Sequence, residues 1–438
     1  MPKESDCNDE VRNSSISQAP LRRLIQRAKD KICDHIEITE KLLCLWKPIF
    51  FRAGFIQNPQ IRLPILKFLK TTGDLFLVFR DFPMVKAYLL ESEIGRAVFV
   101  GVEIEEFKFL FCPCNPIEHV ETYSLWSWQL PEKTKEWLST DVDIVIHGVS
   151  RFFPWRAKAA YYTTTPKWIT QEFRIPEDCD EPPCGKRFRQ LRKIYREKDK
   201  AISYYFSQDE LDFDFFYHKM YVPYISNRHG DFVYLEPYDY LHKWFRKGGL
   251  IVVEYEGKPV AGLLTTKIGS DMYAIEIGLL DGDPKLHEEG FSRVAYWCTV
   301  QYAHKLGCEV FKMGGSYSIR SNGVFRYKST CWYTLVKGFY SVILNEWRFY
   351  LNNPSPKIID YLNQWGIINR YKKAHYAVFF DDGDNQDSEI LNEAVIKAYS
   401  DGLEGIVRVM PWNYEYVPYA ALPHQNPTKD WIYMGRNQ

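Results

Sequence analysis

The order of residue patterns between Leu250 and Gly315 constrains the fold of this chain more than any other feature. The apolar runs divide into a hairpin with a Gly-containing turn, a third strand, a helix with one apolar stripe that ends at Gly307, and a further strand. The segments are LIVVEYEGKPVAGLLTTKIG (250–269), DMYAIEIGLL (271–280), 291–306 and EVFKMGG (309–315). Strands interrupted by one long helix predict an α/β (α+β) fold class, with a mixed sheet flanked by helices.

The length of the chain and the remaining patterns predict several structural units. The 438 residues allow two or three domains. Apolar side chains at helical spacing predict helices in 21–70, and strands are expected at 74–82, 97–104 and 141–149. The Thr-, Pro- and Cys-rich stretch 160–185 is the expected boundary. We expect a disordered tail at 1–20, an N-terminal unit at 21–170, a central domain at 185–345, and a C-terminal α/β extension at 346–438 that either extends the sheet or packs as a third unit.

Charge, apolar segments and cysteine content exclude several classes of protein. The 56 basic and 56 acidic residues balance, so net charge does not favour nucleic acid or an anionic membrane. The polar first residues lack the apolar stretch of a secretory signal, and no run approaches the roughly 20 apolar residues of a membrane span. Ten cysteines without a signal predict reduced thiols in a cytoplasmic protein. Cys112, Cys114 and His119, or Cys179 and Cys184, fit no standard zinc spacing, so no metal is expected.

One segment is strongly basic despite the neutral chain. GKRFRQLRKIYREK (185–198) carries seven Lys or Arg residues against one Glu. It is either a solvated helix with Phe188, Leu191 and Tyr195 packed inward, or a patch for the phosphates of a cofactor or an RNA. Charge runs usually serve solubility, which favours the first interpretation.

Four segments of the second half carry a family resemblance. They are FYHKMYVPYISNRHGD (216–231), IVVEYEGKPVAGLLTTKIG (251–269), QYAHKLGCEVFKMGGS (301–316) and NGVFRYKSTCW (322–332). In this order they resemble the Fem-like branch of the Gcn5-related N-acyltransferase superfamily, which includes peptidoglycan-bridge aminoacyltransferases and BioF2-like acetyltransferases. The resemblance covers about 185–344 and implies a sheet whose fourth strand splays from its fifth, so that an acyl donor inserts between them. It also implies two tandem domains, with a degenerate first copy among the strands of 74–149.

By position, 272–280 resembles the splayed strand of that family and 309–315 the fifth strand. The family's Arg/Gln-x-x-Gly-x-Gly/Ala turn for the donor diphosphate is absent between them. Four acids stand there instead, Asp281, Asp283, Glu288 and Glu289, and they would repel a diphosphate. The loop therefore argues against acyl-coenzyme A and is compatible with aminoacyl-tRNA. In a purely structural interpretation, Asp283 caps a helix that begins at Pro284.

The segment GGSYSIRSNGVFRYKSTCW (314–332) supplies most of the candidate site. Strand five ends at two glycines, where a backbone can approach a ligand, and a polar loop follows at the carboxyl edge of the sheet. Lys328 matches the family lysine by position, so it could stabilise an oxyanion or a phosphate. Tyr317 is a second catalytic candidate, and both Lys328 and Arg326 could instead be solvated surface charges. The candidates for donor or cofactor binding are Gly314, Gly315, Ser316, Asn322, Arg326 and Arg293.

The general base and the acceptor side have their own candidates. Glu276 lies in an apolar strand, where a half-buried carboxylate would have a raised pKa and accept a proton near neutrality; alternatively it faces outward. His218, Tyr221 and Tyr224 lie in an aromatic helical segment that could line an acceptor groove, although a lone His is more often structural. Aromatic residues make up 16% of the chain, enough for such a groove.

The sequence therefore predicts an N-acyltransferase that moves an activated acyl or aminoacyl group onto a primary amine. The co-substrate would be acyl-coenzyme A or aminoacyl-tRNA, the acceptor a small-molecule or peptide amine, and attack direct, without an acyl-enzyme or a covalently bound cofactor. Transfer RNA is the candidate macromolecular partner. The alternative is a non-catalytic binding or scaffold protein with a degenerate donor loop.

Overall fold

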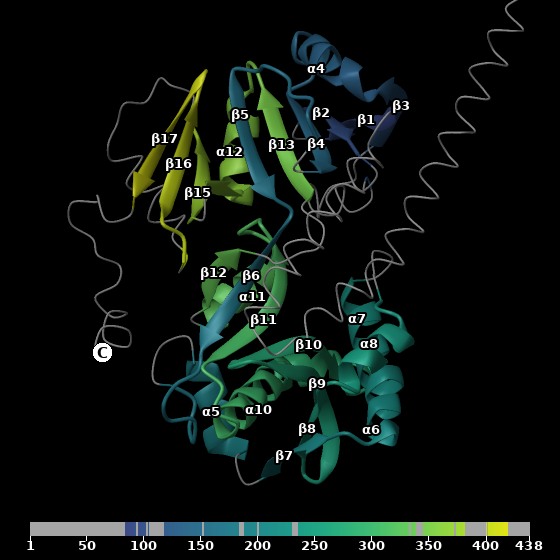
Figure 1. Cartoon of the computed structure of the whole chain (residues 1–438), viewed down its shortest axis with the longest axis vertical. Helices are drawn as coiled ribbons and strands as arrows, with labels where there is room; N and C mark the ends of the chain where they lie inside the picture. Colours follow the sequence, from purple (N-terminus) through teal and green to yellow (C-terminus); the bar gives the residue numbers. More distant parts are fainter. Residues whose placement is uncertain are drawn as a thin grey trace, which may run out of the picture.

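The computed structural model describes residues 84–418, apart from 93–94, 102–103, 105–117, 151–152, 184–187, 199–200, 230–234, 333, 339–344, 372–373, 382–399 and 401. The expected tail, the helices of 21–70, the strand at 74–82 and residues Cys112, Cys114 and Cys184 lie outside these residues. Within them, no helix is long and apolar enough to span a bilayer. The chain forms a six-stranded, a seven-stranded and a four-stranded sheet (Figure 1), which we call sheets A, B and C.

Sheet B contains the hairpin and the crossover that the sequence predicted. Its order is β12-β6-β11-β10-β9-β8-β7. The strands are β6 (Trp168–Arg174), β7 (Ile202–Ser207), β8 (Gly249–Tyr255), β9 (Lys258–Ile268), β10 (Asp271–Leu279), β11 (Val310–Tyr317) and β12 (Leu335–Gly338). Glu256 and Gly257 form the β8–β9 turn, both with positive φ, as a type I′ turn requires. The mixed α/β fold class is confirmed, because β10 and β11 are parallel and α10 (Phe291–Lys305) connects them.

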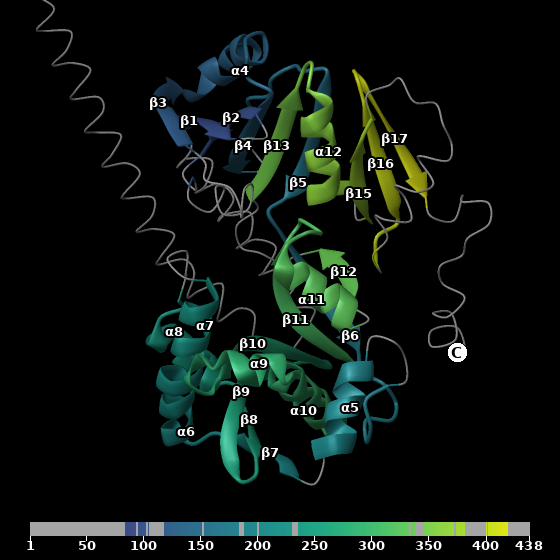
Figure 2. The same cartoon turned by 180° about the vertical axis from the view of Figure 1, so that it is seen from behind.

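Helices cover both faces of sheet B. Residues alternate between the faces along β8, so that Ile251 and Val253 pack with α10, while Leu250 and Val252 pack against the opposite helical layer. The first layer also contains α5 (Arg189–Lys198). The second contains α6 (Glu210–Phe215), the π-helix η3 (Phe216–Tyr221), α7 (Val222–His229) and α8 (Tyr238–Phe245), which lie together in Figure 2.

Sheet A has the order β3-β1-β2-β4-β13-β5. The strands are β1 (Met84–Ser92), β2 (Gly95–Val100), β3 (Glu118–Trp126), β4 (Ile144–Ser150), β5 (Tyr161–Pro166) and β13 (Asn345–Leu351). Beside them lie the short η1 (Ser127–Gln129) and α4 (Leu130–Leu138). The strands expected at 97–104 and 141–149 are present as β2 and β4, which pair in parallel.

The two sheets exchange strands. After Lys167, β5 of sheet A continues as β6, which pairs with β11 and β12 of sheet B. In return β13, which follows β12, pairs with β4 and β5 of sheet A. The order β2-β4-β13-β5 therefore repeats as β10-β11-β6-β12, which gives two similar mixed sheets. The expected boundary at 160–185 is in part regular strand, because β-branched Thr163 and Thr165 alternate with less buried residues.

The C-terminal residues form a unit of their own rather than extending sheets A or B. Sheet C consists of β14 (Ile368–Tyr371), β15 (Ala374–Phe380), β16 (Gly405–Met410) and β17 (Asn413–Pro418). The helix α12 (Pro356–Trp365) precedes it and packs with residues of sheets A and C in one core. The strands expected around HYAVFF and GIVRVMPW are β15 and β16; the helix expected between them lies outside the described residues.

Candidate functional site

The strands β10 and β11 separate after a short ladder. Their paired residues are Asp271 with Val310, Met272 with Phe311, and Tyr273 with Lys312, although both strands continue. Beyond this point each strand is irregular against its other neighbour: the register shifts between Ala274 and Glu276 in β10, and between Lys312 and Gly315 in β11. We call this divergence the β10–β11 splay. The resemblance implied it, and the strand pairing shows it.

Lys328 and Gly314 line the splay. Gly314 has φ +75°, and a Cβ there would lie 3.6 Å from the Ala274 carbonyl oxygen and 4.0 Å from Lys328 Nζ. Lys328 lies on α11 (Gly323–Cys331), which Asn322 caps by accepting hydrogen bonds from the N–H groups of Val324 and Phe325.

Lys328 is a buried amine, so its interpretation as a solvated surface charge is wrong. Its side chain is 4% exposed, and Nζ donates a 2.8 Å hydrogen bond to the carbonyl oxygen of Gly315. Burial lowers the pKa of Lys328 to about 7, although the nearby Glu276 carboxylate favours the charged form. The group is therefore poised to gain or lose a proton near neutrality.

Glu276 directly follows the bulge in β10 and is half-buried. Its carboxylate makes no hydrogen bond or ion pair with any other residue that the structure describes. Desolvation raises the pKa of Glu276 to about 8; the negative charge of Glu236 raises it further, while Lys328 lowers it. An unpartnered carboxylate with this pKa has the proton affinity of a general base at neutral pH.

The π-helix η3 packs closely against one glycine of β10 and one glycine of β9. A Cβ on Gly278 would lie 2.6 Å from the Tyr221 nitrogen, and one on Gly262 would lie 2.6 Å from the Phe216 ring. Close backbone contact therefore depends on glycine at both positions. Tyr221 is 1% exposed, and its pKa is raised by burial and by the charge of Glu276, which places it beside that carboxylate.

Two further tyrosines belong to the same surroundings. The pKa of Tyr296 is raised by burial, then by Tyr327, Tyr224 and Glu276. The Tyr224 hydroxyl accepts a 2.8 Å hydrogen bond from Arg228 and lies 3.2 Å from His287 Nδ1.

The loop before α10 differs from the diphosphate-binding turn of the resembled family. It contains η5 (Leu280–Gly282) and α9 (Pro284–Glu288), and Asp283 caps α9 by accepting a 2.8 Å hydrogen bond from the Lys285 N–H. This confirms the structural interpretation of Asp283. At Gly290, the N-cap of α10, a Cβ would lie 2.5 Å from Ile194 of α5, and Arg293 donates to Gln190 of α5. Helix α5 thus covers the N-terminus of α10.

The apolar side of α5 packs as expected. Phe188 and Leu191 are buried, and Tyr195 packs against the same core. Arg189, Lys193 and Arg196 are exposed.

The other predicted site residues either lie away from Glu276 and Lys328 or are engaged in contacts with other side chains. Ser316 is 1% exposed and donates a 2.8 Å hydrogen bond to Gln171. Tyr317 stacks on Trp168, with ring centroids 4.1 Å apart, and on Trp347 of sheet A. His218 is exposed beside the rings of Tyr217 and Tyr238, and Arg326 is exposed on α11. The structure therefore brings together Glu276, Lys328, Gly314, Gly315 and Tyr221, and it does not bring Tyr317, Arg326 or His218 to them.

Sequence reasoning missed Glu236 and Tyr296. Tyr296 belongs to the stretch of α10 that was interpreted only as an apolar stripe. Glu236 precedes Pro237 in the aromatic-rich segment 234–244. An acidic residue among aromatic residues, close to the start of a helix, was the one signal in the sequence that could have indicated it.

The corresponding position in sheet A is closed. The β2–β4 ladder continues to the end of β2, where Val100 pairs with His147. The fully buried Phe99 ring lies within 3.3 Å of the Cβ positions of Gly101 and Gly148. The splay with ionisable groups is therefore a feature of sheet B.

The central part of sheet B consists of an antiparallel hairpin followed by two parallel neighbouring strands, which diverge and are connected by a helix. The central sheet thus has the splay that the resemblance to the Gcn5-related N-acyltransferases implied. No family model matches the sequence, and no curated protein matches it.

Several solved structures match part of this chain at low sequence identity and low TM-score. L-PGS from Bacillus licheniformis shares 14% identity over 69% of this chain and 94% of its own, with a TM-score of 0.29. FemX shares 12% identity over 53% of this chain and 81% of its own, with a TM-score of 0.31. A GCN5-related N-acetyltransferase from Sphaerobacter thermophilus shares 10% identity over 61% of this chain and 75% of its own, with a TM-score of 0.29.

Proposed function

We propose that the protein is an N-acyltransferase that joins an activated acyl or aminoacyl group to a primary amine at the β10–β11 splay. The observation that carries this proposal is the interaction of Glu276 on β10 with the buried Lys328 amine beside Gly314 and Gly315 of β11, with pKa values of about 8 and about 7. Environments that bring a carboxylic acid and an amine to similar proton affinity are typical of acid–base sites.

The chemistry needs only these two groups and an activated donor. The acceptor amine attacks the carbonyl carbon, a C–N bond forms, and the attacking nitrogen loses a proton to the Glu276 carboxylate. The Lys328 ammonium stabilises the negative charge on the carbonyl oxygen. When the tetrahedral intermediate collapses, the bond to the leaving sulfur or oxygen breaks, and the leaving group receives the proton that Glu276 took from the nitrogen. Acyl–X and R–NH₂ thus give an amide and HX, without an acyl-enzyme.

The surroundings of α10 favour a donor other than acyl-coenzyme A. Ile194 covers Gly290, and Gln190 accepts from Arg293, so the helix N-terminus that would receive a diphosphate is in contact with α5. The exposed Arg189, Lys193 and Arg196 of α5 supply cations for a phosphate backbone instead. Among the two donors predicted from the sequence, these contacts support aminoacyl-tRNA, the donor class of the Fem-like branch.

A transfer assay with both donor classes tests this function. Purified full-length protein is incubated with acyl-coenzyme A or aminoacyl-tRNA and a panel of primary amines, and amide products are identified by mass spectrometry. We expect a product in which Glu276→Gln lowers turnover by about 10²–10⁴-fold and Lys328→Met by about 10²–10³-fold. Lys258→Met, at the exposed end of the β8–β9 hairpin, is the matched control and should leave turnover unchanged. Product formation that survives both Glu276→Gln and Lys328→Met would refute the assignment.

A further inference from the structure

Glu236 is held in place by two tyrosines of the π-helix. Tyr221 accepts a 2.9 Å hydrogen bond from the Glu236 N–H, and Tyr217 donates a 3.2 Å hydrogen bond to the Glu236 carbonyl oxygen. Both peptide groups of one residue are thus fixed by hydroxyls four positions apart on η3. The side chain is half-buried, immediately before α8.

These two hydrogen bonds, which we call the Glu236 clamp, are connected to β10, the strand that carries Glu276. Residue Tyr221 lies at the close contact between η3 and Gly278 of β10, two residues after Glu276. The position of Glu236 relative to Glu276 is therefore set by a short, rigid path: β10, the Gly278 contact, Tyr221 and the Glu236 backbone. π-helical turns are rare and concentrate at functional sites.

The charge of Glu236 acts on Glu276 more strongly than that of Lys328 does, and in the opposite direction. Two carboxylates therefore share a partly desolvated region, and the charge of Glu276 also acts on Tyr221 and Tyr296. Such a pair disfavours a second negative charge and favours a cation.

We propose that Glu236 is a specificity-determining residue that binds the acceptor as its ammonium ion and positions it for Glu276. The inference rests on the proposed acyl transfer. R–NH₃⁺ beside the Glu236 carboxylate transfers one proton to the Glu276 carboxylate and becomes R–NH₂. Glu276 releases this proton to water before the amine attacks, so that its carboxylate can accept the proton that the attacking nitrogen loses later. Glu236 exchanges no proton. The cation also lowers the pKa of Glu276 while it is bound, which puts that group into its basic form when an acceptor is present. Cationic amines are selected over neutral nucleophiles such as alcohols.

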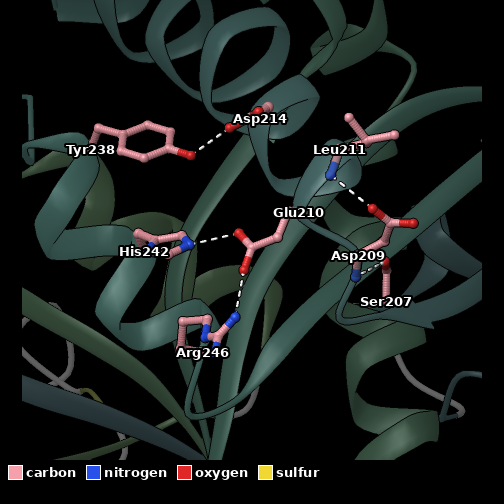
Figure 3. Close-up of polar contacts among 8 residues, drawn as sticks. All are labelled: Ser207, Asp209, Glu210, Leu211, Asp214, Tyr238, His242 and Arg246. Carbon is pink, nitrogen blue, oxygen red and sulfur yellow. Dashed lines mark hydrogen bonds and ion pairs between the residues drawn. The ribbon is translucent and has the colours of Figure 1, made fainter.

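The first measurement does not depend on activity. The pKa of Glu276 is followed by ¹³C NMR of protein labelled at the glutamate carboxyl carbon, with Glu276→Gln used to assign the signal. We expect Glu236→Gln to lower the pKa of Glu276 by about one unit. The matched control is Glu210→Gln on α6. Figure 3 shows the Glu210 carboxylate between His242 and Arg246, 2.6 and 2.8 Å away, and Glu210 does not contribute to the shift of Glu276.

The second measurement uses n-hexylammonium and n-hexanol as probes of the same signal. Wild-type protein should bind the ammonium ion at least about tenfold more tightly than the alcohol. Glu236→Gln should abolish that preference, Glu236→Asp should restore part of it, and Tyr221→Phe should weaken it because the clamp loses the acceptor of the Glu236 N–H. Thermal melts of each variant check the fold.

The outcomes separate this inference from the proposed function. An unchanged Glu276 pKa in Glu236→Gln, or equal binding of both probes by wild-type protein, overturns the inference. If transfer is found and Glu236→Gln raises the acceptor KM by about tenfold or more with a smaller change in kcat, the inference is supported. If transfer is found and that KM is unchanged, the inference fails while the function stands. If no transfer is found but ammonium selectivity depends on Glu236, the cation site is supported and the function fails.

Discussion

At the scale of single residues, burial rather than a direct ion pair sets the chemistry of the site. Desolvation is the largest cause of the shifted pKa of both Glu276 and Lys328, and their mutual attraction is secondary. The sequence indicated the first of these groups, since an acid in an apolar strand is expected to be partly desolvated. It did not separate Lys328 from the exposed Arg326, because a difference of two positions on one helix decides which of the two basic side chains points inward.

The first prediction concerns the pH dependence of transfer. The productive form needs Glu276 deprotonated and Lys328 protonated, and their pKa values are about 8 and about 7. We expect kcat/KM to follow a bell-shaped curve with its maximum between these values. The pH profile of Glu276→Gln should lack the acidic limb, and the pH profile of Lys328→Met should lack the alkaline limb. A flat profile for the wild-type protein between pH 6 and 9 would contradict these roles.

The second prediction concerns stability. The folded-state pKa of Glu276 is raised above its unfolded value of 4.5, so the folded chain holds a proton that the unfolded chain loses. This contribution is present below pH 4.5 and is lost as pH rises through about 8, with a slope of up to about 1.4 kcal/mol per pH unit. Lys328, with a lowered pKa, acts in the opposite direction but only above about pH 7. Urea unfolding at pH 5 and pH 7 should therefore show Glu276→Gln gaining stability relative to wild type as pH rises; a constant difference would contradict the raised pKa.

At the scale of elements, periodic segments were predictable and their irregularities were not. The β8–β9 hairpin, β10 and α10 follow directly from alternation, a Gly turn and an apolar stripe. The π-helical turn of η3 has no signal in the pattern, because one extra residue per turn leaves the apolar spacing close to helical. The splay itself came from the family resemblance, and strand propensity alone would have predicted continuous pairing of β10 and β11.

The third prediction tests the splay as the donor site. Gly314→Asn keeps the left-handed backbone, which Asn tolerates, but projects a side chain toward Lys328 Nζ. Binding of an unreactive donor analogue, measured by calorimetry, should weaken at least about tenfold. Gly307→Asn is the matched control, because Gly307 has φ +67° and open space around its Cβ position. Equal effects of the two substitutions would attribute the loss to backbone strain rather than to blocking of the splay.

At the scale of the whole molecule, the strand exchange couples sheets A and B. Strand β6 of sheet B directly follows β5 of sheet A in the chain, and β13 of sheet A follows β12 of sheet B. The family resemblance implied two tandem domains. The sequence pattern could not indicate the strand exchange, since β5 and β6 lie in one Thr-rich stretch and β13 begins at the predicted end of the central domain. Pairing partners depend on contacts far apart in the chain, which local patterns do not record.

The fourth prediction follows from this coupling. Trp347 of β13 is 2% exposed and stacks with Tyr317 of sheet B and Trp365 of α12. Trp347→Ala should destabilise the protein by about 3–5 kcal/mol. Probes in sheet A and in sheet B should then report one shared unfolding transition with a lowered midpoint. Fluorescence probes placed in each sheet would detect this. Two separate transitions, with only the one in sheet A lowered, would show that the sheets unfold independently.

The most direct test is a double-mutant cycle of the transfer rate with Glu276→Gln, Lys328→Met and the double variant. If the two groups act as one unit on a single transition state, the double variant should be about as slow as the slower single variant, because each substitution alone already disables the pair. Losses that multiply would show two independent contributions, and full activity in either single variant would contradict the account.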